Sequence, residues 1–151
     1  MYTTVLIIHS WVRWIALVAG VGATMAALRG KGDAAGSGTE RWSLFLMMAL
    51  DIQMLLGLLL YLVLSPITKE ALKDFVVAMR NPQLRFWGVE HATMMFAAVI
   101  LVHVGRVLAR KAPTADAKRS RLLVCCGLAT FAMLLGMPWP FMATGRPLFK
   151  F

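Results

Sequence analysis

Two histidines are the residues with the clearest potential for chemistry in this sequence. His9 lies near the start of the first long apolar run, and His91 lies near the start of the third. If both runs are helices that enter a bilayer from the same side, a rise of ~1.5 Å per residue places His9 about 6 Å and His91 about 7–8 Å below the start of its run. Two neutral imidazoles that face each other across a macrocycle are the ligands of a bis-histidine haem iron. The matched depth therefore predicts a haem site, with an interhelical hydrogen bond or a chance match as the alternatives.

Three residues near this depth are candidates for the same site. Arg13 follows His9 by four residues and shares its helical face. Its expected partner is Glu90, a haem propionate or another anionic ligand, and an Arg13–Glu90 pair between the first and third runs is the purely structural alternative. Gly57 lies seven residues from the end of the second run, where a glycine leaves room for a ring beside the backbone. Close packing of helices, which small residues also serve, is the alternative and explains a lone glycine better.

Asp51 and His103 predict a second polar site, nearer to the other ends of their runs. His103 follows His91 by twelve residues, which is about 18 Å along a helix. Asp51 lies nine residues into the second run from its first residue, so the two side chains are within reach of each other. We expect a buried hydrogen-bonded pair, with part of a proton or quinone site as the alternative. A second bis-histidine haem is disfavoured because the sequence has three histidines.

The composition shows what kind of elements must position these residues. The chain has 151 residues, of which 60% are hydrophobic and 15% charged, and its mean hydropathy is +0.72. These values exclude a soluble globular enzyme and a disordered chain. The net charge of +9 comes from basic residues that lie between apolar runs, which is typical of loops beside membrane spans and not of a nucleic-acid-binding surface. Cys125 and Cys126 are adjacent within an apolar run, so no disulfide framework is implied.

Four apolar runs predict four membrane-spanning helices, at residues 4–28, 42–64, 84–108 and 116–137. A span needs about 20 apolar residues, and the fourth run reaches that length only if its basic start, with Thr114 as N-cap, extends into the headgroups. Between the second and third spans, Ser65 and Pro66 begin a short amphipathic interfacial helix at residues 66–80. We expect an all-α integral membrane protein, a four-helix up-down bundle that forms a single membrane domain over residues 1–151.

The distribution of basic residues predicts the orientation of this bundle. Nine lie in the two loops that share one side: Arg29, Lys31, Arg41, Arg106, Arg110, Lys111, Lys118, Arg119 and Arg121. Six lie on the other side: Lys69, Lys73, Arg80, Arg85, Arg146 and Lys150. Because basic loops stay in the cytoplasm, both termini are expected outside it. Arg85 and Arg146 are then at the outer surface and are alternative contacts for a propionate.

Four stretches of the chain resemble a known family. They are residues 6–14 (LIIHSWVRW), residues 84–91 (LRFWGVEH), the Gly105–Arg106 pair and residues 136–140 (GMPWP), and they resemble small bacterial four-helix membrane proteins labelled cytochrome b-like. The chain is also distantly similar to the bacterial cytochrome b561-type four-helix bundle. The resemblance implies the four-helix architecture, His9 and His91 as haem ligands, and Arg13 and Glu90 as their neighbours. Three histidines in place of four imply one haem.

The sequence therefore predicts a membrane-embedded b-type haem protein or subunit that transfers electrons near the outer, periplasmic face, with quinone as a further cofactor or partner. The alternative is a structural or assembly subunit of a larger respiratory or photosynthetic membrane complex, without its own redox cofactor or with a bound pigment. Whether the chain is an enzyme stays open. The expected partners are the lipid bilayer and other membrane-complex subunits or a homo-oligomer, with no nucleic acid. The expected location is the bacterial inner membrane.

Overall fold

The computed structural model describes residues 1–30 and 33–147, with the backbone but not the side chains of residues 33–37. Lys31 and Lys150, which entered the orientation argument, lie outside the described residues. Throughout the described part the regular structure is helical and no strand is present, as expected. Four long helices are α1 (Tyr2–Arg29), α2 (Asp33–Leu59), α6 (His91–Arg110) and α7 (Ala115–Leu135).

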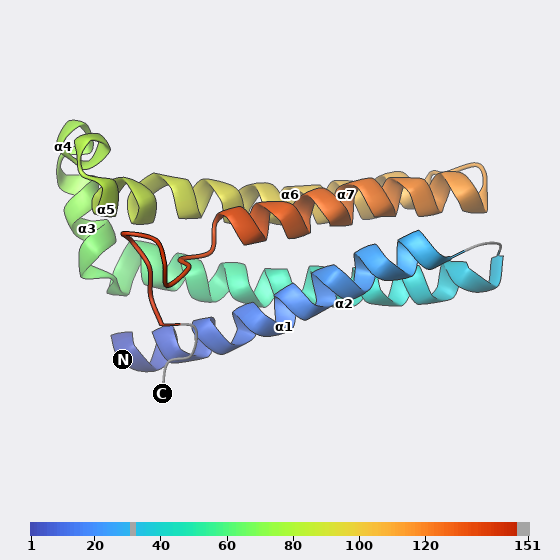
Figure 1. Cartoon of the computed structure of the whole chain (residues 1–151), viewed down its shortest axis with the longest axis horizontal. Coiled ribbons are helices and arrows are strands. Elements are labelled where there is room, and N and C mark those ends of the chain that lie inside the picture. The colour runs from blue at the N-terminus through green and yellow to red at the C-terminus, as the bar shows by residue number, and fades with distance from the viewer. Residues whose placement is uncertain (31–32, 148–151) are drawn as a thin grey trace.

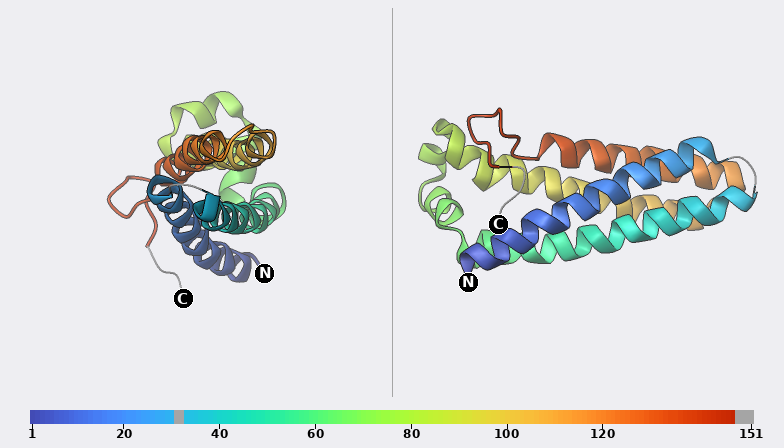
Figure 2. Two further views of the ribbon diagram at one scale, coloured as in Figure 1. Left: turned by 90° about the vertical axis from the view of Figure 1, so that its right-hand side faces the viewer. Right: turned by 60° about the horizontal axis from the view of Figure 1, so that its bottom comes forward.

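The four long helices pack side by side with alternating directions (Figure 1). Helix α1 packs against α2 and α7, and α6 packs against α7 and α2. The views in Figure 2 show the same arrangement end-on and from a second side. The short helices α3, α4 and α5 lie together at one end of the bundle, called the α3–α5 end below, and the N-terminus is near that end. Residues that start α1 and α6 are therefore at the same end.

Three helical stretches are long and apolar enough to cross a membrane by length and composition. They are Tyr2–Arg29, Gly38–Leu64 and Pro82–Arg110. Helix α7 does not meet the same measure, because Lys118, Arg119 and Arg121 occupy its first two turns and leave only residues 122–135 as an uncharged stretch. Thr114 caps α7 as expected, since its side chain accepts a hydrogen bond from the Ala117 N–H.

The bundle core is built mainly from small residues, which let the helix backbones approach closely. Ala19 of α1, Ala98 of α6 and Ala129 of α7 are fully buried, and Leu50 and Val102 fill the space between them. Large apolar side chains lie instead on the outside of the bundle; they include Val18, Leu55, Ile100 and Phe131. A soluble protein rarely exposes apolar surface on this scale, so the exterior is suited to lipid or to another apolar partner.

The amphipathic helix expected at residues 66–80 is two helices, α3 (Pro66–Lys73) and α4 (Phe75–Arg80), followed by α5 (Pro82–Arg85). Ser65 caps α3 as expected. The break falls at Asp74, whose backbone is extended and whose side chain accepts a hydrogen bond from the Val77 N–H. Aspartate satisfies a free helix N-terminus better than it satisfies a helix interior, and this preference ends one helix and starts the next.

Candidate functional site

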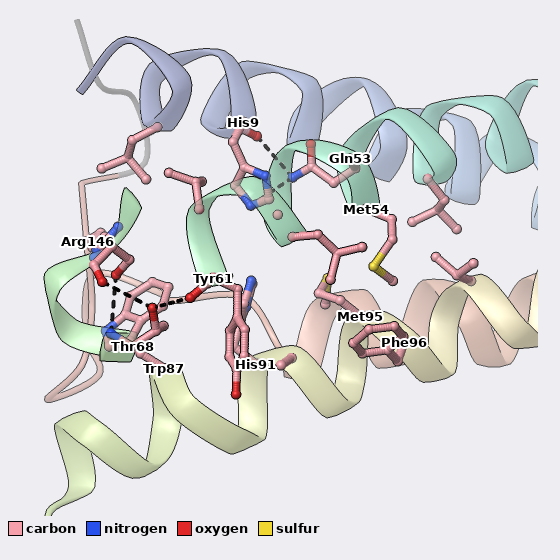
Figure 3. Close-up of a pocket in the computed structure, with 18 of the residues that line it drawn as sticks. His9, Gln53, Met54, Tyr61, Thr68, Trp87, His91, Met95, Phe96 and Arg146 are labelled. Atoms are coloured by element: carbon pink, nitrogen blue, oxygen red, sulfur yellow. Dashed lines mark hydrogen bonds between the residues drawn. The ribbon is translucent and has the colours of Figure 1, made fainter. Parts of the chain in front are cut away.

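The structure brings His9 and His91 together at the α3–α5 end of the bundle. Their ring centroids are 6.3 Å apart and the ring planes are inclined by 69°. Figure 3 shows His9 extending from α1 and His91 from α6 into the same pocket. The proximity that equal depth predicts is present, because the two helices start at the same end and each presents its histidine within three turns of that end.

Two cavities border the gap between the rings. The deep cavity, of about 90 Å³, continues toward the bundle interior, where Met54, Met95 and Phe96 line it. The mouth cavity, of about 200 Å³, lies between α1 and the segment after α7, where Arg13 and Arg146 line it. His9, His91, Trp87 and Arg146 line both cavities, and the deep cavity also reaches Tyr61 and Thr68. The two imidazoles therefore lie between a mainly apolar space and a second space that Arg13 and Arg146 border.

Hydrogen bonding fixes the orientation of the His91 ring. Its Nδ1 lies 2.7 Å from the carbonyl oxygen of Gly136, just after α7. A carbonyl oxygen only accepts, so Nδ1 carries the proton and Nε2 keeps the lone pair. Metal-binding imidazoles usually donate the N–H of the nitrogen that does not bind the metal to an acceptor such as a carbonyl oxygen, as His91 Nδ1 does here.

Gln53 of α2 determines the state of the His9 ring. Its side-chain nitrogen lies 3.2 Å from His9 Nε2 and donates a second hydrogen bond, of 3.0 Å, to the His9 carbonyl oxygen. Because an amide N–H donates, His9 Nε2 accepts and holds the lone pair. His9 Nδ1 is buried and has no hydrogen-bond partner in the described part of the chain. The sequence analysis missed Gln53, although its position four residues before Gly57, on the same helical face, was an available signal.

Two π-helical turns, Leu60–Leu64 and Phe86–Glu90, lie on either side of the pocket and were also missed. The Tyr61 hydroxyl joins them, since it donates a 2.7 Å hydrogen bond to the carbonyl oxygen of Gly88. The second turn directly precedes His91 and so sets the direction in which that side chain leaves the helix. Such turns are rare and frequent at functional sites, but the residues that form them are ordinary apolar helix residues and give no sequence signal.

Gly57 and Arg13 both lie at the site. A Cβ added to Gly57 would lie 3.4 Å from Cε1 of His9, so the His9 ring lies beside this glycine. The Arg13 guanidinium carbon lies 5.3 Å from the centroid of the Trp14 ring, and Arg13 lines the mouth cavity. A cofactor ring beside Gly57 and an anionic ligand of Arg13 stay predictions.

Glu90 lies outside the pocket, contrary to the expectation that it contacts a cofactor. Its side chain is exposed and pairs with Arg85, with 2.6 Å between Glu90 Oε1 and Arg85 Nε. The π-helical turn brings residues five positions apart onto one face, and Arg85 and Glu90 have this separation. The expected Arg13–Glu90 pair is therefore replaced by a pair within one helical turn, and Arg85 lines neither cavity beside the imidazoles.

Asp51 and His103 do come together, but on the outside of the bundle. Asp51 Oδ1 lies 3.5 Å from His103 Nε2, and the side chains are 44% and 45% exposed. The expectation of a buried pair is wrong because the neighbouring residues Leu50 and Val102 are the ones that α2 and α6 bury between them. Adjacent residues point about 100° apart on a helix, so the polar pair is turned outward. His103 Nδ1 donates to the Val99 carbonyl oxygen of its own helix at 2.9 Å.

Within the described residues no group of three or more His, Cys, Asp or Glu side chains is placed to hold a metal ion. No family model, curated protein or solved structure matches this chain.

Proposed function

We propose that this chain is a membrane-embedded b-type haem protein whose axial ligands are His9 and His91. The 6.3 Å separation of the ring centroids carries this proposal. Two metal–nitrogen bonds of ~2 Å, together with the distance from each nitrogen to its ring centre, add up to about 6 Å. This separation leaves room for one metal ion once both Nε2 atoms are turned toward it, and inclined ring planes are compatible with it because each ring turns about its own metal–nitrogen bond.

The surroundings of the two rings also support His9 and His91 as the metal ligands. Hydrogen bonds leave Nε2 as the lone-pair nitrogen on both imidazoles, through Gly136 at His91 and Gln53 at His9. Ligation at His9 Nε2 would replace its contact with the Gln53 amide, which keeps its bond to the His9 carbonyl oxygen. The apolar lining at Met95 and Phe96 excludes water from the interior side. A bound haem would supply one-electron redox chemistry, and the protein supplies the two ligands and the dry surroundings that set its potential.

The proposal includes a membrane topology. We infer that α7 is a fourth span whose basic first turns lie among lipid headgroups, and that both termini lie outside the cytoplasm in a bacterial inner membrane. The pocket is then near the outer face, where electrons would pass to or from quinone or another subunit. The apolar exterior residues, such as Leu55 and Ile100, would contact the bilayer, a second copy or a partner subunit.

A structural or assembly subunit without a redox cofactor is the second candidate. It is favoured by the fact that the Gln53 amide already occupies His9 Nε2, and that Tyr61 and His91 have backbone partners in neighbouring segments. Polar groups paired in this way also serve to hold helices together. A bound pigment is a variant, because one histidine is enough to hold a pigment's metal.

An absorption spectrum distinguishes the two candidates. The purified wild-type protein, supplied with haem in detergent, is expected to show a reduced-minus-oxidised b-type spectrum that His9→Ala abolishes. Circular dichroism of both proteins checks that the helices are retained. A well-folded wild type that stays colourless and instead co-purifies with respiratory or photosynthetic subunits would support the assembly role and reject the haem protein.

A further inference from the structure

The mouth cavity has a strongly one-sided charge. Two arginines line it, Arg13 from α1 and Arg146 from the segment after α7, and among the described residues its lining contains no aspartate or glutamate. The other outer arginine near the pocket, Arg85, is held by Glu90 at 2.6 Å. The mouth cavity is therefore suited to an anionic group, and of the two arginines expected at the outer surface, Arg146 lines the cavity and Arg85 does not.

A compact loop holds Arg146 at this position. The Arg146 N–H donates to the Pro138 carbonyl oxygen at 3.2 Å, and the Trp139 indole N–H donates to the Leu134 carbonyl oxygen at 2.9 Å, which ties the loop to the end of α7. A Cβ at Gly145 would collide with the Trp139 carbonyl oxygen, so this close turn requires a glycine. These contacts fix the backbone of Arg146 beside the cavity.

Trp87 provides both a platform for Arg146 and an unused hydrogen-bond donor. The guanidinium carbon of Arg146 lies 3.9 Å from the centroid of the Trp87 ring, which is a close cation–π contact; Figure 3 shows the two residues together at one side of the pocket. The Trp87 indole N–H is buried and has no hydrogen-bond partner in the part of the chain that the structure describes. A buried donor without an acceptor costs free energy, and an oxygen of a ligand in the cavity would supply the acceptor.

We infer that Arg146 and Trp87 bind a carboxylate of the ligand that the two imidazoles hold, which for a haem is a propionate. This inference rests on the proposed function. The Arg146 fork matches the two oxygens of a carboxylate, the Trp87 N–H adds a neutral donor beside it, and Arg13 contributes a second positive charge. The loop of residues 136–147 is then part of the binding site and fixes which edge of the macrocycle faces the α3–α5 end.

The test compares haem with haem dimethyl ester, in which both carboxylates are blocked. The protein without haem is titrated with each form in detergent, and binding is followed by absorbance. Arg146→Gln is expected to weaken binding of haem by about tenfold or more and to leave binding of the ester unchanged. Trp87→Phe keeps an aromatic ring under Arg146 but removes the indole N–H. This variant should weaken the binding of haem by less than Arg146→Gln does.

Arg85→Gln is the matched control, because it removes an arginine at the same end that pairs with Glu90, and it should leave both affinities unchanged. An Arg146→Gln protein that binds both forms like wild type, or loses both equally, overturns the carboxylate site while the haem proposal stands. A wild type that binds neither form overturns the proposed function and this inference together.

Discussion

His91 and His103 lie on the same helix, twelve residues apart, and the structure gives them different surroundings. His91 donates to a carbonyl of another segment, at Gly136, and faces His9 beside two cavities. His103 donates to a carbonyl of its own helix, at Val99, and its other nitrogen faces Asp51 on the half-exposed outside. The comparison teaches that the role of a histidine in a helical bundle follows from what holds its second nitrogen and from the space beside the first.

The same difference holds for packing along the helix. Around His91 the helices leave cavities between them, whereas near His103 the residue Gly105 packs so closely on Cys125 of α7 that an added Cβ would overlap the Cys125 side chain. A ligand site needs room as well as ligands. At Gly105 the two helices leave no space for even one further carbon atom.

Replacing His91 and His103 in turn should give the largest difference between two variants, measured on the haem spectrum. His91→Ala should abolish the b-type spectrum, because it removes one of two iron ligands, while His103→Ala should retain it in full. Reduced-minus-oxidised spectra of both variants, normalised to protein, measure the difference. Loss of the spectrum in His103→Ala with the helices intact would contradict the assignment of the ligand pair.

Gly136→Ala tests how the His91 ring is held, and its effect should be intermediate. An added Cβ would lie 2.7 Å from Met95 Cε and 2.8 Å from Met94 Cβ, so the backbone that carries the carbonyl acceptor must shift. Overpacking of this kind costs about 1–3 kcal/mol. We expect a lower unfolding temperature in detergent and weaker haem binding. A variant that keeps both wild-type values would show that the carbonyl of Gly136 is not needed to orient His91.

Gly57→Ala should have the smallest effect and is the control for the previous substitution. The added Cβ would lie 3.4 Å from His9 Cε1, which is ordinary contact. Because alanine has fewer backbone conformations than glycine, the unfolded chain loses entropy, and the helical backbone at this position suits alanine. We expect stability to be unchanged or to rise by up to about 1 kcal/mol, with the haem spectrum retained. A clear loss of stability in thermal unfolding would show that His9 has no freedom to accommodate a methyl group.

Several features of the site followed from local rules. The apolar runs became helices, and Ser65 and Thr114 became N-caps, because helix formation and capping depend on neighbouring residues. The proximity of His9 and His91 could be predicted because a constant rise per residue places both at a similar depth in their helices. The Glu90 partner was wrong because the sequence analysis assumed a regular α-helix where the chain forms a π-helical turn.

Periodicity, capping and helical rise are properties of short segments, so an apolar, all-helical chain with two histidines at one level could be read from the residues alone. The contacts of the imidazoles with Gln53 and the Gly136 carbonyl, the contact of Arg146 with the Trp87 ring, and the outward position of the Asp51–His103 pair could not. These contacts depend on how each helix is rotated about its axis when small residues pack, and that rotation is a property of the whole bundle.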